Sequence, residues 1–262
     1  MRGSVNPEEA RPLFQHPPCR ARLCKVRRLR PAPLSHPCYD VSVESLAKVD
    51  WSAVVISMAV LLFSLSLHES AHAWMASRRG DPTGRYLGRI TLNPLPHIDW
   101  IGTVLFPLVS MVGSGGLVFF GWAKPVPVNT SNLKNPRWDH VLVAAAGPVS
   151  NILAAVAFLG GLRFLVGFFP AELRGGHTVF YPLYLFCVNG LFLNTILAVF
   201  NLIPIPPLDG SWVLAGIFPN PIAAFFEAIR PYSFILLLAL FMSGVLNVVL
   251  NPVLNLVTVL AS

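Results

Sequence analysis

Long uncharged runs dominate the sequence and constrain its fold more than any other feature. A helix rises about 1.5 Å per residue, so about 20 apolar residues cross a hydrocarbon core of roughly 30 Å. A soluble fold would have to bury every run as a core helix, although soluble helices average about 11 to 12 residues. The sequence therefore predicts an all-α polytopic membrane protein with about five to six transmembrane helices. The runs without Lys, Arg, Asp or Glu are residues 101–123, 141–162, 178–208, 210–226 and 231–262, and residues 51–77 contain only Glu69.

The amino-terminal residues differ from the rest in charge and pattern. Nine of the 19 Lys and Arg residues lie in the first 50 positions, among prolines and without helical or strand periodicity. We expect residues 1–48 to form a disordered basic tail and residues 49–262 to form the membrane domain. Because this tail holds much of the basic charge, the net charge of +7 does not indicate a nucleic-acid partner. The expected environment is the lipid bilayer, with the chain as a multi-pass protein of the cell membrane.

A proline-rich break interrupts the apolar pattern after the predicted fourth span, residues 181–202. Pro204, Pro206 and Pro207 lack the amide donors that a regular helix needs. Non-helical backbone at membrane depth persists only where protein or trapped water satisfies it. The break therefore indicates a functional site. A last span is expected at about residues 232–250.

Two connecting segments have strand-like patterns. Residues 85–93 alternate between polar and apolar side chains, which favours a short strand or hairpin over a helix. Residues 120–129 form a second loop, which Pro125 and Pro127 stiffen. Either segment could offer a strand edge to another chain, or both could be ordered loops that pack on the core.

The segment His68-Glu69-Ser70-Ala71-His72 carries the strongest chemical signal. Two imidazoles four residues apart lie on one helix face, where both can bind one ion, and Glu69 lies one step round the helix. The surrounding helix is apolar, and a charged side chain at the bilayer centre costs at least ~2.5 kcal/mol. A divalent cation would compensate these groups. The alternative is a polar cluster that merely ends the helix.

A catalytic zinc usually has three protein ligands and one open position. Asp209 is the favoured third ligand, because it follows the proline-rich break and is the only charged residue between positions 178 and 226. It could also cap a helix, and the two roles are compatible. The other candidates in or beside apolar runs are His97, Asp99, His140 and His177.

Five segments, in this order, resemble the site-2 protease family of intramembrane metalloproteases, and the resemblance covers about residues 51–250. One is the His68–His72 motif, and another is the stretch through the proline-rich break to Gly210. The full set is residues 68–72, 92–99, 121–129, 146–151 and 200–210. Each segment alone is modest support, and their order makes the combination strong.

This resemblance implies one Zn²⁺ per chain, held by His68, His72 and Asp209, with Glu69 as general base. Asn201 resembles the polar residue that lies beside the metal and holds the substrate carbonyl or the oxyanion. The implied reaction is hydrolysis of peptide bonds in or near transmembrane segments of another membrane protein. The zinc end of the first helix is expected to face the cytoplasm. No loop between the predicted spans is long enough for an inserted peptide-binding domain, so the chain resembles a compact form. Nothing in the sequence indicates an oligomeric state.

Two rival functions remain at this point. A polytopic transporter that binds a metal would also carry intramembrane His, Glu and Asp residues. Transport does not require Glu69 beside a ligand pair, which favours an enzyme. A catalytically inactive membrane scaffold is the second rival, and the presence of every expected ligand and base argues against it.

Overall fold

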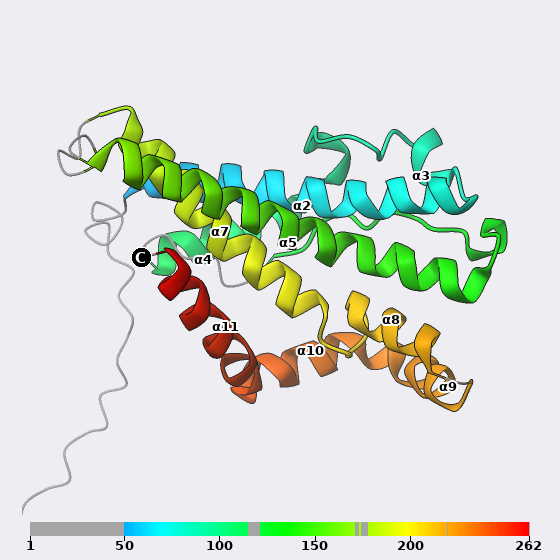
Figure 1. Cartoon of the computed structure of the whole chain (residues 1–262). Helices are drawn as coiled ribbons and strands as arrows, with labels where there is room; N and C mark the ends of the chain where they lie inside the picture. The colour runs from blue at the N-terminus through cyan, green and yellow to red at the C-terminus, as the bar shows by residue number, and fades with distance from the viewer. Residues whose placement is uncertain (1–49, 115–120, 171–172, 174–177, 219, 262) are drawn as a thin grey trace, which may run out of the picture. The chain divides into compact units, whose positions relative to one another are not determined.

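The computed structural model of the chain describes residues 50–114, 121–170, 173, 178–218 and 220–261 (Figure 1). Within these residues it contains helices and loops but no strands. Four helical stretches are long and apolar enough to cross a membrane, and two shorter apolar helices accompany them. The expected all-α polytopic membrane protein is thereby confirmed. The expected tail, residues 1–48, lies outside the described residues.

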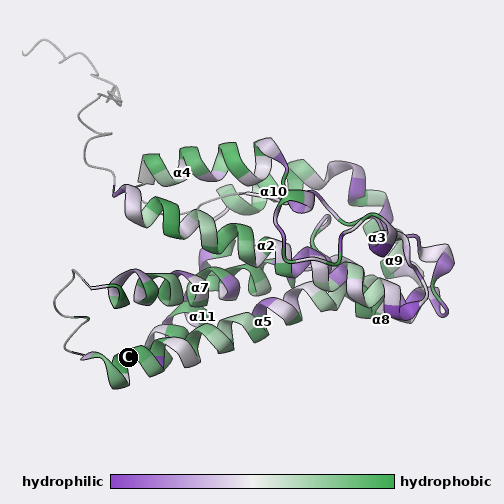
Figure 2. Cartoon of the chain, turned by 90° about the horizontal axis from the view of Figure 1, so that it is seen from above, coloured by the Kyte–Doolittle hydropathy of each residue, from purple (hydrophilic) through white to green (hydrophobic). Residues whose placement is uncertain are grey.

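The spanning stretches are three single helices and one composite. The single helices are α2 (Trp51–Arg79), α5 (Pro136–Phe168) and α7 (Phe180–Asn201). The composite, Pro221–Met242, joins α9 (Asn220–Ile229), η4 (Arg230–Tyr232) and α10 (Ser233–Met242). In Figure 2 most helical ribbon is hydrophobic, and hydrophilic stretches gather at the end of the molecule where α3, α8 and α9 are labelled.

Helix α2 has well-defined signals at both ends. The Asp50 carboxylate accepts hydrogen bonds from the N–H groups of Ser52 and Ala53, at 3.0 and 3.2 Å. At the other end Gly80 adopts a left-handed conformation with a φ of 116°. A Cβ on Gly80 would also lie 2.8 Å from the carbonyl oxygen of Asn132, so glycine is required there. Helix α2 therefore extends two residues beyond the apolar run 51–77 and ends at Arg79.

Helices α2, α5 and α7 pack on one another and form the centre of the bundle (Figure 1). A fully buried polar network joins them. Asn151 on α5 donates through Nδ2 to Asn194 Oδ1 on α7, at 2.8 Å. Asn194 Nδ2 in turn donates to Ser64 Oγ on α2, at 2.8 Å. Interhelical bonds of this kind stabilise helix association where the surrounding lipid cannot satisfy polar groups. The network therefore fixes three helices relative to one another.

The helical structure is interrupted at the proline-rich break, as the sequence predicts. Helix α7 ends at Asn201, and α8 (Asp209–Ile217) begins after the turn. The far end of α8 is held by Arg137 of α5, whose Nε donates to Gly216 O at 2.7 Å. An Nη of the same guanidinium donates to Phe218 O at 2.8 Å. Since α8 also packs along α5, its first residue is held in a fixed position against that helix.

The strand predicted at residues 85–93 is wrong. The segment starts in a short helix, α3 (Thr83–Tyr86), and then turns at Gly88, which has a φ of 67°. The buried Arg89 folds back, because its N–H donates to Gly84 O at 2.9 Å and its guanidinium to Pro96 O at 2.6 Å. Tyr86, Leu87, Ile90 and Leu92 are all exposed, so the alternation does not correspond to one buried face. Residues 121–129 form a loop, as expected, and have no strand partner among the described residues.

Two other predicted spans differ from the observed helices. The uncharged run 101–123, which is long enough to predict a span, begins with η2 (Trp100–Leu105), a stretch of π-helix, and α4 (Phe106–Ser114), and its residues 115–120 lie outside the described part of the chain. The last span is interrupted at Gly244, which has a φ of 73°. Helix α10 therefore ends at Met242, and a separate helix, α11 (Val245–Ala261), follows.

Candidate active site

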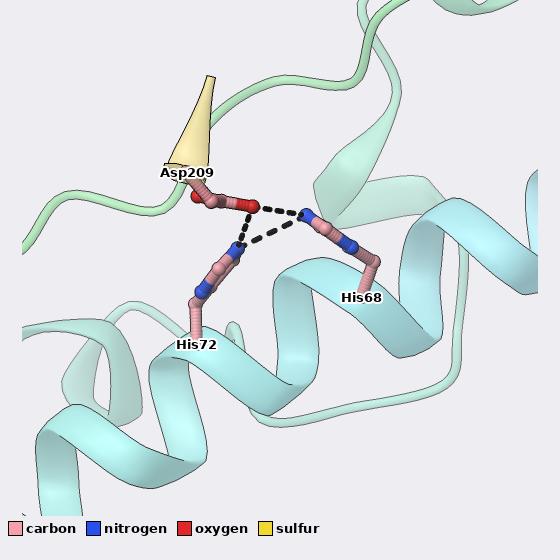
Figure 3. Close-up of side chains that lie close together, drawn as sticks. All are labelled: His68, His72 and Asp209. Atoms are coloured by element: carbon pink, nitrogen blue, oxygen red, sulfur yellow. Dashed lines mark hydrogen bonds and ion pairs between the residues drawn. The ribbon is translucent and has the colours of Figure 1, made fainter. Parts of the chain in front are cut away.

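Three predicted site residues meet although they are far apart in sequence. Helix α2 presents His68 and His72 from adjacent turns, and Asp209 comes from the first turn of α8 (Figure 3). The two histidine Nε2 atoms are 3.0 Å apart. Asp209 Oδ2 lies 3.2 Å from His68 Nε2 and 3.5 Å from His72 Nε2. One ligand atom from each residue thus points into the same small space.

The partners of the other ring nitrogens determine the tautomers of the two histidines. His68 Nδ1 lies 2.6 Å from Asn151 Oδ1, and His72 Nδ1 lies 2.7 Å from the carbonyl oxygen of Val143. The carbonyl oxygen of Val143 can only accept a hydrogen bond. Asn151 Oδ1 also accepts, because Asn151 donates to Asn194 through its Nδ2. In its neutral form each imidazole therefore carries its proton on Nδ1, and its Nε2 presents a lone pair.

These lone pairs make the centre a cation site. Two imidazole nitrogens and a carboxylate oxygen converge, and Asp209 Oδ2 is buried without a hydrogen-bond donor. Three acceptors so close together repel one another unless a positive charge lies between them. Zn²⁺ bound tetrahedrally at about 2.0 to 2.1 Å would separate its ligand atoms by about 3.3 Å. The observed separations of 3.0 to 3.5 Å fit this geometry.

The other candidates for a third ligand do not join this cluster. Burial lowers the pKa of His97, whose Nε2 donates to Thr91 O at 3.1 Å. Asp99 caps η2, because its carboxylate accepts from the N–H groups of Ile101 and Gly102. His140 lines the same cavity without belonging to the cluster. His177 lies outside the described residues.

Gly147 allows α5 to approach the two histidines. A Cβ at this position would lie 2.4 Å from His72 Nε2 and 2.6 Å from His68 Cε1, closer than any real contact. The roles of Gly147, Asn151, Val143 and Asn194 could not be predicted from the sequence. Gly147 and Asn151 belong to the segment 146–151, one of the five that resemble the family, but only the packing of α5 on α2 reveals what these two residues do.

A cavity of about 510 Å³ adjoins the cluster and holds the remaining predicted residues. Glu69 and Asn201 both line it, together with Val126 of the loop 121–129. Glu69 Oε2 accepts from the Val126 N–H at 3.0 Å, and Asn201 Nδ2 donates to Leu197 O at 2.9 Å. Space for a peptide therefore lies beside a carboxylate, an amide and a cation site.

Such a site inside a helical membrane bundle defines a class, the membrane-embedded metallopeptidases. Comparison with known proteins identifies the family. Residues 56–241 match the model described as peptidase family M50. The chain belongs to this family. Peptidase family M50 is the site-2 protease family that the five sequence segments resemble, so that resemblance is confirmed.

Three curated relatives support the assignment. The chain is 38% identical over 196 residues to the protein named "Putative zinc metalloprotease YwhC" of Bacillus subtilis, covering 74% of this chain and 84% of the relative. It is 30% identical over 193 residues to "Putative zinc metalloprotease Rip2" of Mycolicibacterium smegmatis, and 32% identical over 193 residues to the protein of that name from Mycobacterium tuberculosis. Each match covers 74% of this chain and 69% of the relative. No solved structure matches the chain. The transporter and scaffold alternatives are not favoured.

Proposed function

We propose that this membrane peptidase is zinc-dependent, with one Zn²⁺ per chain held by His68, His72 and Asp209. The observation that carries the proposal is the convergence of two Nε2 lone pairs and a buried carboxylate oxygen that has no donor. The names of the three relatives support zinc as the metal. When bound, zinc would polarise a peptide carbonyl and lower the pKa of water towards about 7.

Metal analysis of two histidine variants tests this proposal. We expect about one zinc per chain in the purified wild type and almost none in His72→Ala, because two remaining ligands bind zinc poorly. His140→Ala is the matched control, since His140 lines the same cavity but lies outside the cluster. It should retain zinc. Unchanged zinc in His72→Ala, or equal loss in His140→Ala, would overturn the ligand assignment.

Glu69 is proposed as the group that moves the proton. Its Oε2 is held by the Val126 N–H, and its Oε1 has no partner among the described residues, so one oxygen is oriented and the other is available. The carboxylate would accept a proton from the attacking water and later pass it to the leaving amine. The position of Glu69, next to His68 on α2, brings this base to the edge of the cation site.

Asn201 is proposed to act on the substrate. One N–H of its amide donates to Leu197 O within α7, which leaves a second N–H for the oxyanion that develops on the scissile carbonyl. Its place in the wall of the cavity, outside the three-residue cluster, supports this role over metal binding.

The variant Asn201→Leu separates a substrate role from a structural one. We expect zinc content and thermal stability close to wild type, with turnover lower by about 10² to 10³, the usual cost of one oxyanion donor. Asn189→Leu, also on α7 but outside the cavity, is the control. Full activity in Asn201→Leu, or loss of zinc from it, would contradict the proposal.

The proposed substrate is a transmembrane protein of the cell membrane in which this chain resides. A helix must be unwound before one of its peptide bonds can enter the cavity, and Pro125, Val126 and Val128 of the loop 121–129 line that cavity. Backbone pairing of the unwound substrate with residues 121–129 would differ from the pairing of two ordinary β-strands. Pro125 and Pro127 carry no N–H, so they could offer a substrate only their carbonyl groups.

A further inference from the structure

Two adjoining cavities lie outside the active site, at the end of α2 near α3. The first, of about 470 Å³, is lined by Arg78, Arg85 and Ser77, and no acidic residue is among its lining residues. The second, of about 350 Å³, is an apolar groove between α2 and α5, where Val149 and Leu153 are among the lining side chains. Trp74 and Ile90 line both cavities. A basic pocket therefore continues into an apolar groove.

The two arginines of the basic pocket lack an anionic partner among the described residues. The neighbouring arginines have partners within the protein. Arg79 lies 3.7 Å from the Asp139 carboxylate, and Arg89 donates to backbone carbonyls. The Arg78 guanidinium lies 5.2 Å from the centre of the Trp74 ring. A cation–π contact does not use the guanidinium N–H groups, so they remain available to phosphate oxygens.

Exposed side chains around the pocket indicate a membrane–water interface. The segment after α2 carries three highly exposed large side chains, Tyr86, Leu95 and Trp100, with 83%, 71% and 75% of their surface accessible. Tyrosine and tryptophan concentrate at the headgroup level of bilayers, where one part of the ring is apolar and another is polar. Since α2 ends at Arg79, the basic pocket lies where a spanning helix meets the headgroups.

We propose that these two cavities form a binding site for one anionic phospholipid. The phosphate lies between Arg78 and Arg85, and an acyl chain follows the apolar groove over Val149 and Leu153. Charge complementarity favours this occupant over a zwitterionic lipid, because the pocket offers two positive charges and no negative one. The groove favours it over free phosphate, which has no apolar part to bury. The site lies apart from the catalytic cavity and does not depend on the proposed zinc chemistry.

Lipid binding to the full-length chain in detergent tests the headgroup part. Native mass spectrometry would compare phosphatidylglycerol with phosphatidylcholine of the same acyl chains. A basic residue beside an anionic headgroup is worth roughly fivefold in affinity, so we expect the wild type to prefer phosphatidylglycerol by at least tenfold. Arg78→Gln and Arg85→Gln should each weaken phosphatidylglycerol binding by roughly fivefold, and the double variant should lose the preference.

Lys134→Gln is the matched control, because it removes one charge from an exposed residue outside both cavities. It should bind phosphatidylglycerol as the wild type does. An absent preference in the wild type, unchanged binding in the double arginine variant, or an equal loss in Lys134→Gln would each overturn the proposal.

Two further measurements test the acyl-chain part. Val149→Trp should fill the groove and weaken phosphatidylglycerol binding at least tenfold, whereas Val156→Trp, two turns further along α5 and also exposed, should not. Unchanged lipid binding in Val149→Trp would contradict the proposed groove. Inorganic phosphate should raise the thermal stability of the wild type less than phosphatidylglycerol does. Equal stabilisation would mean that the pocket binds phosphate without the lipid.

Discussion

Glu69→Gln is expected to abolish proteolysis while leaving the metal in place. An amide cannot accept the proton of the attacking water, and general-base catalysis typically contributes 10² to 10⁴ to the rate. The substitution hardly changes the size of the side chain, and the new carbonyl oxygen can still accept from the Val126 N–H. The rate of cleavage of a membrane-helix reporter by the reconstituted protein should therefore fall by at least 10², with zinc content unchanged.

The control for this prediction is the same chemical change elsewhere in the chain. Glu227→Gln alters an exposed carboxylate on α9, which lies 3.1 Å from Arg230, and should cleave the reporter at the wild-type rate. Wild-type cleavage by Glu69→Gln would show that Glu69 is not the base. Loss of zinc from that variant would show instead that Glu69 supports the metal.

The parts of the site that the sequence could predict follow from local geometry. Helical periodicity alone places His68 and His72 on one face, and a run of prolines in an apolar segment identifies the break before Asp209. Local geometry does not select Asp209 over His97 and His140 as the third metal ligand, since all three side chains are chemically suitable. Its isolation among uncharged residues favoured it, and the observed cluster contains Asp209 alone of these three.

The supporting groups could not be predicted because they depend on tertiary packing. Asn151 is 83 positions from His68 in the sequence, and the carbonyl of Val143 is a backbone group that no motif identifies. The misassigned strand has a similar origin. The apolar members of the alternating segment 85–93 are exposed, whereas Arg89 is buried and donates to backbone carbonyls. A local pattern cannot distinguish this arrangement from a half-buried strand.

Backbone conformation explains the remaining difference in the fold. The predicted last span, about residues 232–250, contains Ser243 and Gly244 but no charge and no proline, so hydropathy predicts one continuous helix there. Gly244 instead takes a φ of 73°, which separates α10 from α11. A single glycine in a membrane helix is common, and it therefore gave no signal of this turn.

Gly147→Ala is expected to empty the metal site, although Gly147 is not a metal ligand. The new Cβ would lie 2.4 Å from His72 Nε2, so either the imidazole must leave the cluster or α5 must move away from α2. The second response would also separate Asn151 Oδ1 from His68 Nδ1, which are 2.6 Å apart. Loss of one supporting contact typically lowers metal affinity 10- to 100-fold, and here a ligand itself is displaced. We expect zinc affinity to fall by at least 100-fold.

Gly160→Ala is the control, because Gly160 lies on the same helix and a Cβ there would meet no atom within 4 Å. Alanine in a helix interior is more favourable than glycine by roughly 0.5 to 1 kcal/mol, so Gly160→Ala should keep its zinc and lose no thermal stability. Zinc affinity is measured by competition with a chelator, and folding is followed independently by circular dichroism. A folded Gly147→Ala protein with wild-type zinc affinity would mean that the close approach of α5 is not needed to form the site. A folded protein without zinc would establish that the small residue on α5, as much as the ligands on α2 and α8, determines whether this bundle holds a metal.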